Sequence, residues 1–115
     1  MFDVNGKFLT EWGSHGTSTC QFSNPEFLCI TNKNHLIVSD SFNHRIQIFD
    51  VSSSSIKDIG LFVGSFGSFG KKLGSFRFPK GVTTDDEGFI MVADWKNNRH
   101  DRDLNINKIR KYLNK

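Results

Sequence analysis

The chain repeats itself at an offset of 54 residues, and the register needs no gap from Gly6 to Arg99. A fixed period of this length is typical of solenoids, propellers and repeat arrays, because each unit has an apolar face that only a neighbouring unit can cover. The repeat therefore constrains the fold more tightly than any single residue. Within this span, eleven pairs of residues are identical at this offset: Gly6 and Gly60, Phe8 and Phe62, Gly13 and Gly67, Ser14 and Ser68, Gly16 and Gly70, Phe22 and Phe76, Pro25 and Pro79, Val38 and Val92, Asp40 and Asp94, Asn43 and Asn97, and Arg45 and Arg99.

Apolar residues recur at every second position in short runs, which is the period of β-strands. The segments 32–34 and 85–88 between runs are rich in Asn, Asp and Gly, which tolerate the positive φ values of tight hairpins. Four strands per repeat predict a β-propeller blade. We therefore expect an all-β fold with two four-stranded antiparallel blades in an incomplete ring. The predicted strands cover residues 7–12, 27–30, 36–39 and 45–49 in the first unit, and 61–66, 81–84 and 89–93 in the second.

Three stretches carry a resemblance to a known repeat. Residues 38–50, 76–88 and 90–99 closely resemble NHL repeats, and residues 62–70 resemble the link between one such blade and the next. The first unit departs from the pattern, since Phe27 and Thr31 stand where the repeat usually has Gly and Asp. The blades look most like those of animal tripartite-motif NHL proteins, which include Brat-like repressors of messenger RNA and RING ubiquitin ligases.

The length of 115 residues allows at most one domain, with a first blade at about 8–50 and a second at about 56–99. A propeller closes only with roughly four to eight blades, so two blades bury little core. We expect a partial gene product, or alternatively a chain that assembles with other copies. No run is long or apolar enough to span a membrane, and the start has no signal-peptide pattern.

The period ends after Arg99, and residues 100–115 form an atypical basic tail. The register requires an alternating apolar strand here, which the tail does not supply, so the second blade is expected to be frayed. Ile106, Ile109 and Leu113 could line one side of a short helix. The sudden loss of the period favours an alternative or mispredicted exon end.

The net charge of +3 comes from the end of the chain, where residues 99–115 hold six Lys/Arg against two Asp. The distribution of charge is more informative, because a blade sends its connections alternately to two faces. One face, formed by residues 13–26, 40–45, 67–80 and 94–99, carries seven Lys/Arg against three acidic residues. The opposite face, formed by residues 3–7, 31–35, 49–60 and 85–88, carries three Lys against six acidic residues.

Aromatic side chains stand beside the cations on the basic face, and single-stranded RNA is held by such stacking surfaces. The resemblance points the same way, since related propellers bind short RNA elements on one face. For Phe78 and Trp95 the alternative is packing between blades. The candidate RNA-binding residues are Phe42, His44, Arg77, Lys80, Lys96 and Asn98.

Residues that recur in register are expected to serve the repeat itself. Asp40 and Asp94 each precede an Arg by five residues in a strand–turn–strand, which predicts a structural ion pair. The Asn side chains are expected to close the same turn. The structural turn residues are Asp40, Asn43, Arg45, Asp94, Asn97 and Arg99.

No catalytic constellation is visible, since the four His are scattered and no nucleophile is paired with a base. Cys20 and Cys29 lack the spacing of a zinc site. We expect no cofactor, no metal, no membrane contact and no small-molecule substrate. The alternative to an RNA-binding platform is a propeller that recruits protein substrates to a ubiquitin ligase whose RING domain is not part of this sequence. The resemblance also implies a cytoplasmic protein.

Overall fold

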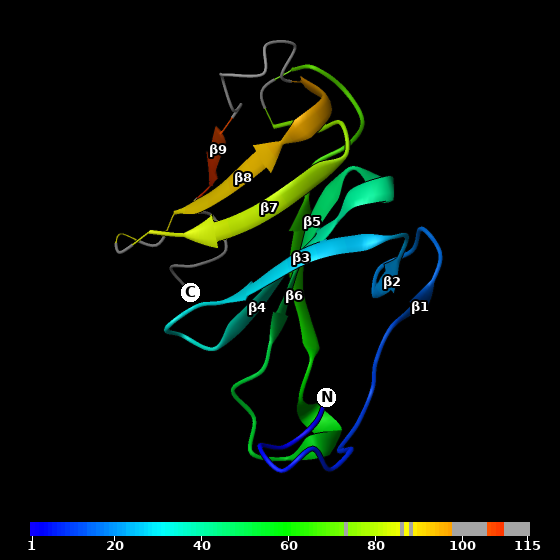
Figure 1. Cartoon of the computed structure of the whole chain (residues 1–115), viewed down its shortest axis with the longest axis vertical. Coiled ribbons are helices and arrows are strands. Elements are labelled where there is room, and N and C mark those ends of the chain that lie inside the picture. Colours follow the sequence, from blue (N-terminus) through cyan, green and yellow to red (C-terminus); the bar gives the residue numbers. More distant parts are fainter. Residues whose placement is uncertain (73, 86, 88, 98–105, 110–115) are drawn as a thin grey trace.

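The structure is a computed structural model that describes residues 1–72, 74–85, 87, 89–97 and 106–109. It is an all-β arrangement whose two larger sheets are antiparallel, with three one-turn 3-10 helices between strands (Figure 1). The strands are β1 (Ser14–His15), β2 (Gln21–Phe22), β3 (Pro25–Ile30), β4 (His35–Asp40), β5 (Arg45–Asp50), β6 (Leu61–Phe66), β7 (Pro79–Thr84), β8 (Ile90–Asp94) and β9 (Ile106–Ile109). The 3-10 helices are η1 (Ser41–Asn43), η2 (Ile56–Asp58) and η3 (Trp95–Asn97).

The first blade is a four-stranded sheet in the order β3-β4-β5-β6, with every neighbouring pair antiparallel. The hairpin between β3 and β4 is closed where the sequence predicts it. The amide of Asn34 donates to the carbonyl of Thr31 at 3.0 Å, and Asn34 has a φ of 60°. Asparagine tolerates this left-handed conformation, so the residue type explains the turn.

The boundaries of the blades do not coincide with the boundaries of the sequence repeat. Strand β6 lies in the second sequence unit, yet it pairs with β5 as the fourth strand of the first blade. The equivalent segment 7–12 forms no comparable strand, and only an isolated bridge joins Phe2 and Phe8. The expectation of a strand at 7–12 is therefore wrong. Among the described residues, this segment has no counterpart of β5 beside it that could supply the backbone hydrogen bonds of a ladder.

The second blade has three strands among the described residues, in the order β7-β8-β9. Strand β9 comes from the tail and lies antiparallel to β8, with Ile109 opposite Ile90 and Ile106 opposite Ala93. The helix considered for the tail is therefore wrong at residues 106–109, because an open edge of β8 offers backbone hydrogen bonds to an extended segment. Leu113 lies outside the described residues.

The two blades share their hydrogen-bonding pattern as well as their sequence. The amide of Ser23 donates to Oδ1 of Asp40 at 2.7 Å, and the amide of Arg77 donates to Oδ1 of Asp94 at 2.8 Å. These two pairs are related by the offset of 54 residues. Asp40 and Asp94 thus occupy equivalent turns, each followed by a one-turn helix, η1 or η3.

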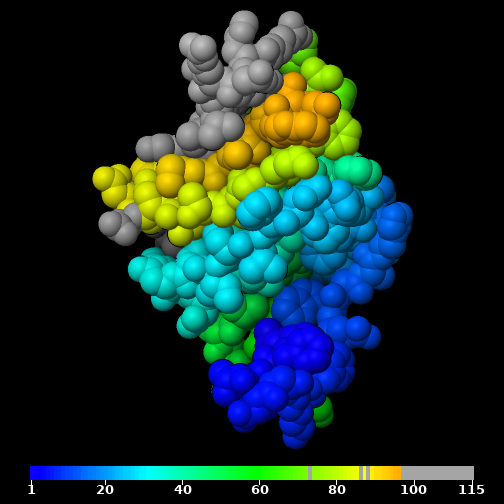
Figure 2. Space-filling model, viewed as in Figure 1, coloured from blue at the N-terminus to red at the C-terminus, as the bar shows by residue number. Residues whose placement is uncertain are grey.

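The main core lies between the two blades. Strands β3 and β7 run side by side (Figures 1 and 2), and β4 also contacts β7. Each sheet turns one face of alternating side chains toward the other, as the pleat of a strand requires. The buried cluster contains Ile37, Ile46 and Ile48 from the first blade and Phe76, Val82, Ile90 and Val92 from the second, with Cys29, Val63 and Phe66 packed against it.

The opposite face of the first blade is partly covered by aromatic side chains. Phe49 is fully buried, and its ring contacts those of Trp12, Phe22 and Phe62 at centroid distances of 6.3, 5.8 and 6.0 Å. Gly60 lies beneath Trp12, where a Cβ would stand 2.8 Å from the indole. Aromatic side chains therefore cover part of the outer face of the first blade.

Candidate functional site

Asp40 is the centre of a buried polar network at the end of β4. Its carboxylate is fully buried and accepts hydrogen bonds from Asn43 Nδ2 at 2.9 Å, Arg45 Nε at 2.8 Å and Gln47 Nε2 at 3.3 Å. Together with the amide of Ser23, four donors stabilise the charge that burial would otherwise disfavour. The ion pair expected between Asp40 and Arg45 is present.

Arg45 ties this turn to the link that precedes β2. Its guanidinium donates at 2.8 Å to the carbonyls of Thr17, Ser18 and Gln21. Asn43 adds a 2.8 Å hydrogen bond to the carbonyl of Gly16. The planar guanidinium group of an arginine suits such a cluster of acceptors. The charge of Arg45 is therefore engaged within the fold. In the second repeat, Arg99 and the side chain of Asn97 lie outside what the structure describes.

His44 stands at the junction between the two blades. It follows η1 with a left-handed φ of 52°, and its Nδ1 accepts a 3.0 Å hydrogen bond from the amide of Phe78 at the start of the second blade. Its ring lies edge-on to Phe69 and Phe78, at centroid distances of 4.8 and 4.5 Å. Phe42 makes a further edge contact with Phe78 at 5.5 Å. A continuous aromatic group therefore bridges the blades.

The environment of His44 lowers its pKa from the ordinary 6.5. Partial burial is the main cause, since it disfavours the charged imidazolium. The positive charge of Arg77 acts in the same direction, and the carboxylate of Asp94 opposes it. The hydrogen bond from Phe78 also requires an unprotonated Nδ1, so His44 is a neutral acceptor at this junction.

Arg77 is held beside the aromatic group by its own backbone. Its amide donates to Asp94, and its carbonyl accepts from the amide of Lys96 at 3.0 Å. The guanidinium carbon lies 5.4 Å from the ring centre of Phe69, within the range of a cation–π contact. Its Nε is buried and has no hydrogen-bond partner among the residues that the structure describes.

Trp95 carries a second group of cations. It begins η3, and its side chain is 48% exposed. The ammonium groups of Lys80 and Lys96 lie 4.5 and 4.1 Å from its ring centre. Lys80 also approaches the carboxylate of Glu26 at 3.6 Å. Trp95 is thus exposed between two lysines in this structure, whereas Phe78 is half-buried at the blade junction.

The structure brings five of the six candidate RNA-binding residues to the ends of strands where the two blades meet. Asn98 lies outside the described residues. Sequence reasoning missed Phe69, which is 62% exposed and contacts both His44 and Arg77. Its position between Gly67 and Gly70 in the link was a signal for an exposed aromatic at a turn. We define the interblade aromatic surface as Phe42, His44, Phe69, Arg77, Phe78, Lys80, Trp95 and Lys96.

This surface can bind but contains no evident machinery for a reaction. Exposed rings offer stacking, and the cations beside them offer charge to phosphate groups. In the described part of the chain, no group of three or more His, Cys, Asp or Glu side chains is placed to hold a metal ion. Cys20 and Cys29 are free thiols, and burial raises the pKa of Cys29. Among the helices that the structure describes, none is long and apolar enough to cross a membrane.

The period, the antiparallel sheets and the repeated turns define a repeat protein built from β-propeller blades. Residues 22–49 match the NHL repeat. The chain is therefore an NHL-repeat protein, and its blades are similar to those of animal tripartite-motif NHL proteins.

Three curated relatives illustrate this similarity. The protein brain tumor of Drosophila melanogaster is 33% identical over 85 residues, which cover 73% of this chain and 8% of that protein. The E3 ubiquitin-protein ligase TRIM71 of Rattus norvegicus is 41% identical over 70 residues, which cover 56% of this chain and 8% of that protein. The same protein of Mus musculus matches with the same identity and coverage. The chain thus spans about 8% of the length of the relatives it matches.

Proposed function

We propose that the interblade aromatic surface binds a short single-stranded element of messenger RNA. NHL propellers are binding domains, and the blades described above supply a binding platform without catalytic groups of their own. The observation that carries the RNA proposal is the interleaving of Phe42, Phe69 and Trp95 with Arg77, Lys80 and Lys96 at one junction. Bases stack on aromatic faces while cations follow the backbone.

The exposed rings support this proposal more than the net charge does. Phe42 is 55% exposed beside the half-buried Phe78, so one ring supports another that is open to solvent. Arg45 is already engaged with Asp40 and three carbonyls, so it is excluded from the proposed contacts. The candidate phosphate contacts are therefore Arg77, Lys80 and Lys96. We place this activity in the cytoplasm, where post-transcriptional repression of messenger RNA acts.

The test is binding of the chain to a fluorescent single-stranded RNA, measured by anisotropy at several salt concentrations. The double variant Lys80→Glu with Lys96→Glu is expected to weaken binding and to flatten its salt dependence. Each lost phosphate contact removes about 0.7 from the slope of log K against log salt for a single strand. The matched control is Lys33→Glu with Lys57→Glu, which makes the same change of charge on the opposite face.

Equal losses from both double variants would mean diffuse attraction without a dedicated face, and would contradict the proposal. No binding by the unchanged chain, or no loss from either variant, would favour the second candidate. In that case the surface recruits a protein partner, as the name of the relative TRIM71, an E3 ubiquitin-protein ligase, suggests. Any ligase activity would then belong to a RING domain elsewhere in the full protein.

A further inference from the structure

The link between the two blades carries a serine among basic residues. Ser75 is preceded by Lys71 and Lys72, and Arg77 follows it by two positions. Of all serines and threonines in the sequence, Ser75 alone has two Lys or Arg among the four residues before it and another within two residues after it. One large class of serine kinases selects substrates by such positive charge, because acidic side chains line the substrate cleft. The pattern therefore indicates an acceptor for a phosphoryl group.

The matching link of the first repeat lacks this pattern. At the offset of 54 residues, Gln21 stands in place of Ser75, and Thr17 and Ser18 stand in place of the two lysines. The glycines and the phenylalanine of the link are the same in both repeats. The first blade thus forms its link without the hydroxyl and without the cations, so the blade fold itself does not explain them.

The side chain at this position is engaged in the first repeat and free in the second. Gln21 Oε1 accepts a hydrogen bond from the amide of Ser18 at 3.1 Å, and its Nε2 donates to Oγ of Ser14 at 3.3 Å. Both links keep the same backbone turn, since the amide of Ser75 donates to the carbonyl of Lys72 at 2.9 Å, as that of Gln21 does to Ser18 at 3.0 Å. The hydroxyl of Ser75 has no hydrogen bond among the residues that the structure describes.

The link presents its cations to solvent. Lys71, Lys72 and Gly74 are exposed and Ser75 is half-buried, whereas Phe76 is fully buried. A kinase binds the residues around its acceptor in an extended form, so the link has to open locally before the reaction. Such local openings cost less free energy than global unfolding. The kinase therefore acts on a briefly opened link, and Phe76 returns to the core afterwards.

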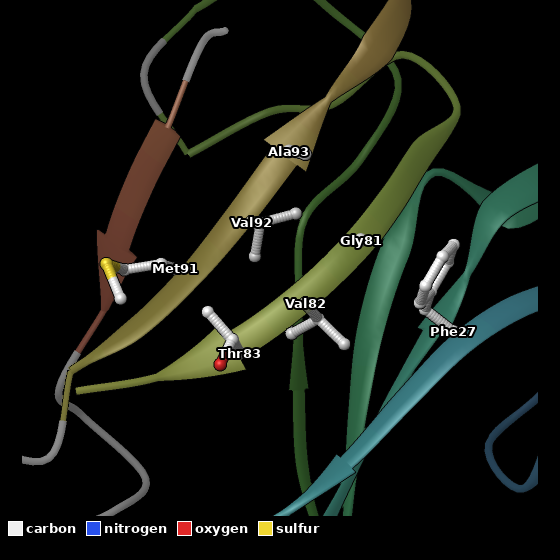
Figure 3. Close-up of a pocket in the computed structure, with 7 residues that line it drawn as sticks. All are labelled: Phe27, Gly81, Val82, Thr83, Met91, Val92 and Ala93. Atoms are coloured by element: carbon white, nitrogen blue, oxygen red, sulfur yellow. The ribbon is translucent and has the colours of Figure 1, made fainter.

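Thr83 provides an internal comparison, because it also follows a lysine, Lys80, by three residues. It lies within β7 opposite Met91 of β8, and both side chains line a hollow of about 370 Å³ (Figure 3). A kinase would have to break this ladder to reach Thr83. Ser75 lies outside the strands, and a turn hydrogen bond holds its amide. The link is therefore the better acceptor.

We propose that a serine kinase selecting basic residues phosphorylates Ser75, and that the phosphate weakens RNA binding by the interblade aromatic surface. This regulatory role rests on the proposed function. The phosphoryl donor is Mg-ATP. A bond forms between Oγ of Ser75 and the γ-phosphorus, and the bond from that phosphorus to the β–γ bridging oxygen breaks. ADP leaves, and the hydroxyl proton passes to the catalytic aspartate of the kinase.

The phosphate lies beside two members of the interblade aromatic surface. Arg77 is two residues from Ser75, at most about 7 Å along the chain. The hydroxyl of Ser75 also lies against Gly70, the neighbour of Phe69, since a Cβ at Gly70 would stand 3.4 Å from Oγ. A phosphoserine carries about −1.5 to −2 charges at pH 7, and charges act over about 8 Å at physiological salt. The phosphate therefore offsets the charge of Arg77 and repels the RNA backbone.

The first test treats the purified chain with Mg-ATP and the catalytic domain of a serine kinase that selects basic residues, followed by mass spectrometry of its peptides. A single phosphate is expected, on Ser75. Ser75→Ala should abolish it, and Lys71→Ala with Lys72→Ala should slow it at least about tenfold. The matched control is Ser68→Ala, an exposed serine of the same link, which should change nothing.

A synthetic peptide of residues 68–80 shows whether the kinase is active in the same assay. Modification of the peptide without modification of Ser75 in the chain would overturn the proposal. So would an unchanged rate in the double-lysine variant, because the cations would then play no part in recognition.

The second test compares the RNA affinity of phosphorylated and mock-treated chains in the anisotropy assay described above. The phosphorylated chain should bind at least about tenfold more weakly, and its salt slope should fall by about 0.7 for the loss of the Arg77 contact. Ser75→Ala should bind RNA like the unchanged chain and should not respond to the kinase. Equal affinities of the two forms would overturn the regulatory role. No RNA binding by the mock-treated chain would contradict the proposed function and the regulatory role together, whereas mass spectrometry decides the modification site independently.

Discussion

The backbone amide of Phe78 donates a 3.0 Å hydrogen bond to Nδ1 of His44, and this bond joins the first residues of one blade to the turn of the other. Both residues have positive φ, 52° for His44 and 56° for Phe78. Two non-glycine residues thus have this uncommon backbone conformation at one contact. The junction fixes the position of the rings on which the proposed RNA surface depends.

Stability should depend on pH through His44. The pKa of His44 is lowered in the folded chain, mainly by burial, so the unfolded chain takes up the proton first as pH falls. The contribution of neutral His44 to the free energy of unfolding is therefore fully present above about pH 6.5, the ordinary pKa of histidine. It decreases as the pH falls below 6.5 toward the lowered pKa of the folded chain. Urea denaturation at pH 7.5 and pH 5.5 measures the difference.

His44→Asn is the matched variant for this prediction, because asparagine tolerates a left-handed φ and keeps an acceptor without titrating. The second repeat itself has an asparagine at the equivalent position, Asn98. The variant should retain stability at pH 7.5 and lose a part of the pH dependence. An unchanged pH profile in His44→Asn would contradict the assignment.

Removal of the Asp40 carboxylate should destabilise the first blade severely. Asp40→Ala leaves the donors of Asn43, Arg45 and Gln47 without their common acceptor, and the Arg45 charge without its partner. Breaking a buried pair in this way costs about 3–5 kcal/mol. The free energy of unfolding from urea titration measures it. Asp58→Ala, at an exposed position of η2, should change stability by less than about 0.5 kcal/mol.

Gly67→Ala should be much more harmful than Gly74→Ala, although both glycines have positive φ, 100° and 82°. A Cβ at Gly67 would stand 2.6 Å from Cε2 of Phe76 and 3.1 Å from the carbonyl oxygen of His44. A Cβ at Gly74 would meet nothing within 4 Å. Gly74→Ala should therefore cost only the backbone penalty of about 1 kcal/mol, with a further loss of about 1–3 kcal/mol at Gly67. Equal midpoints of thermal unfolding would refute this difference.

Phe42→Ala should separate stacking from charge on the proposed RNA surface. Loss of one stacked base weakens binding by about 1–3 kcal/mol, while the slope of affinity against salt should stay constant because no phosphate contact is lost. Anisotropy titrations at two salt concentrations measure both quantities. Phe2→Ala is the control, since Phe2 is also an exposed aromatic but lies in the N-terminal hairpin with Phe8. A steeper or flatter slope in Phe42→Ala would argue against a stacking role.

Local sequence patterns predicted the elements of the first blade well. Strands β3, β4 and β5 lie where alternation predicted them, and the Asp40–Arg45 pair follows from spacing in a strand–turn–strand. The wrong predictions concern which segments find a partner strand, not which segments favour an extended conformation. The segment 7–12 has the alternation of a strand, but no strand among the described residues lies beside it to form a ladder, and β9 lies outside the sequence repeat but pairs with β8. The alternation of apolar and polar residues indicates which face a strand would bury. Whether the ladder of backbone hydrogen bonds forms depends on a partner strand beside it.

The candidate site followed the same division. The sequence by itself determined the 54-residue period, the blade class and the equivalence of Asp40 with Asp94, because each depends on residues close along the chain or on identity at a fixed offset. The tertiary structure alone decided that His44 contacts Phe69 and Phe78, that Trp95 is exposed between two lysines, and that Arg45 also donates to three backbone carbonyls at residues 17–21. The contacts of His44 join separate repeats, and the packing between blades, which no local pattern encodes, sets their geometry.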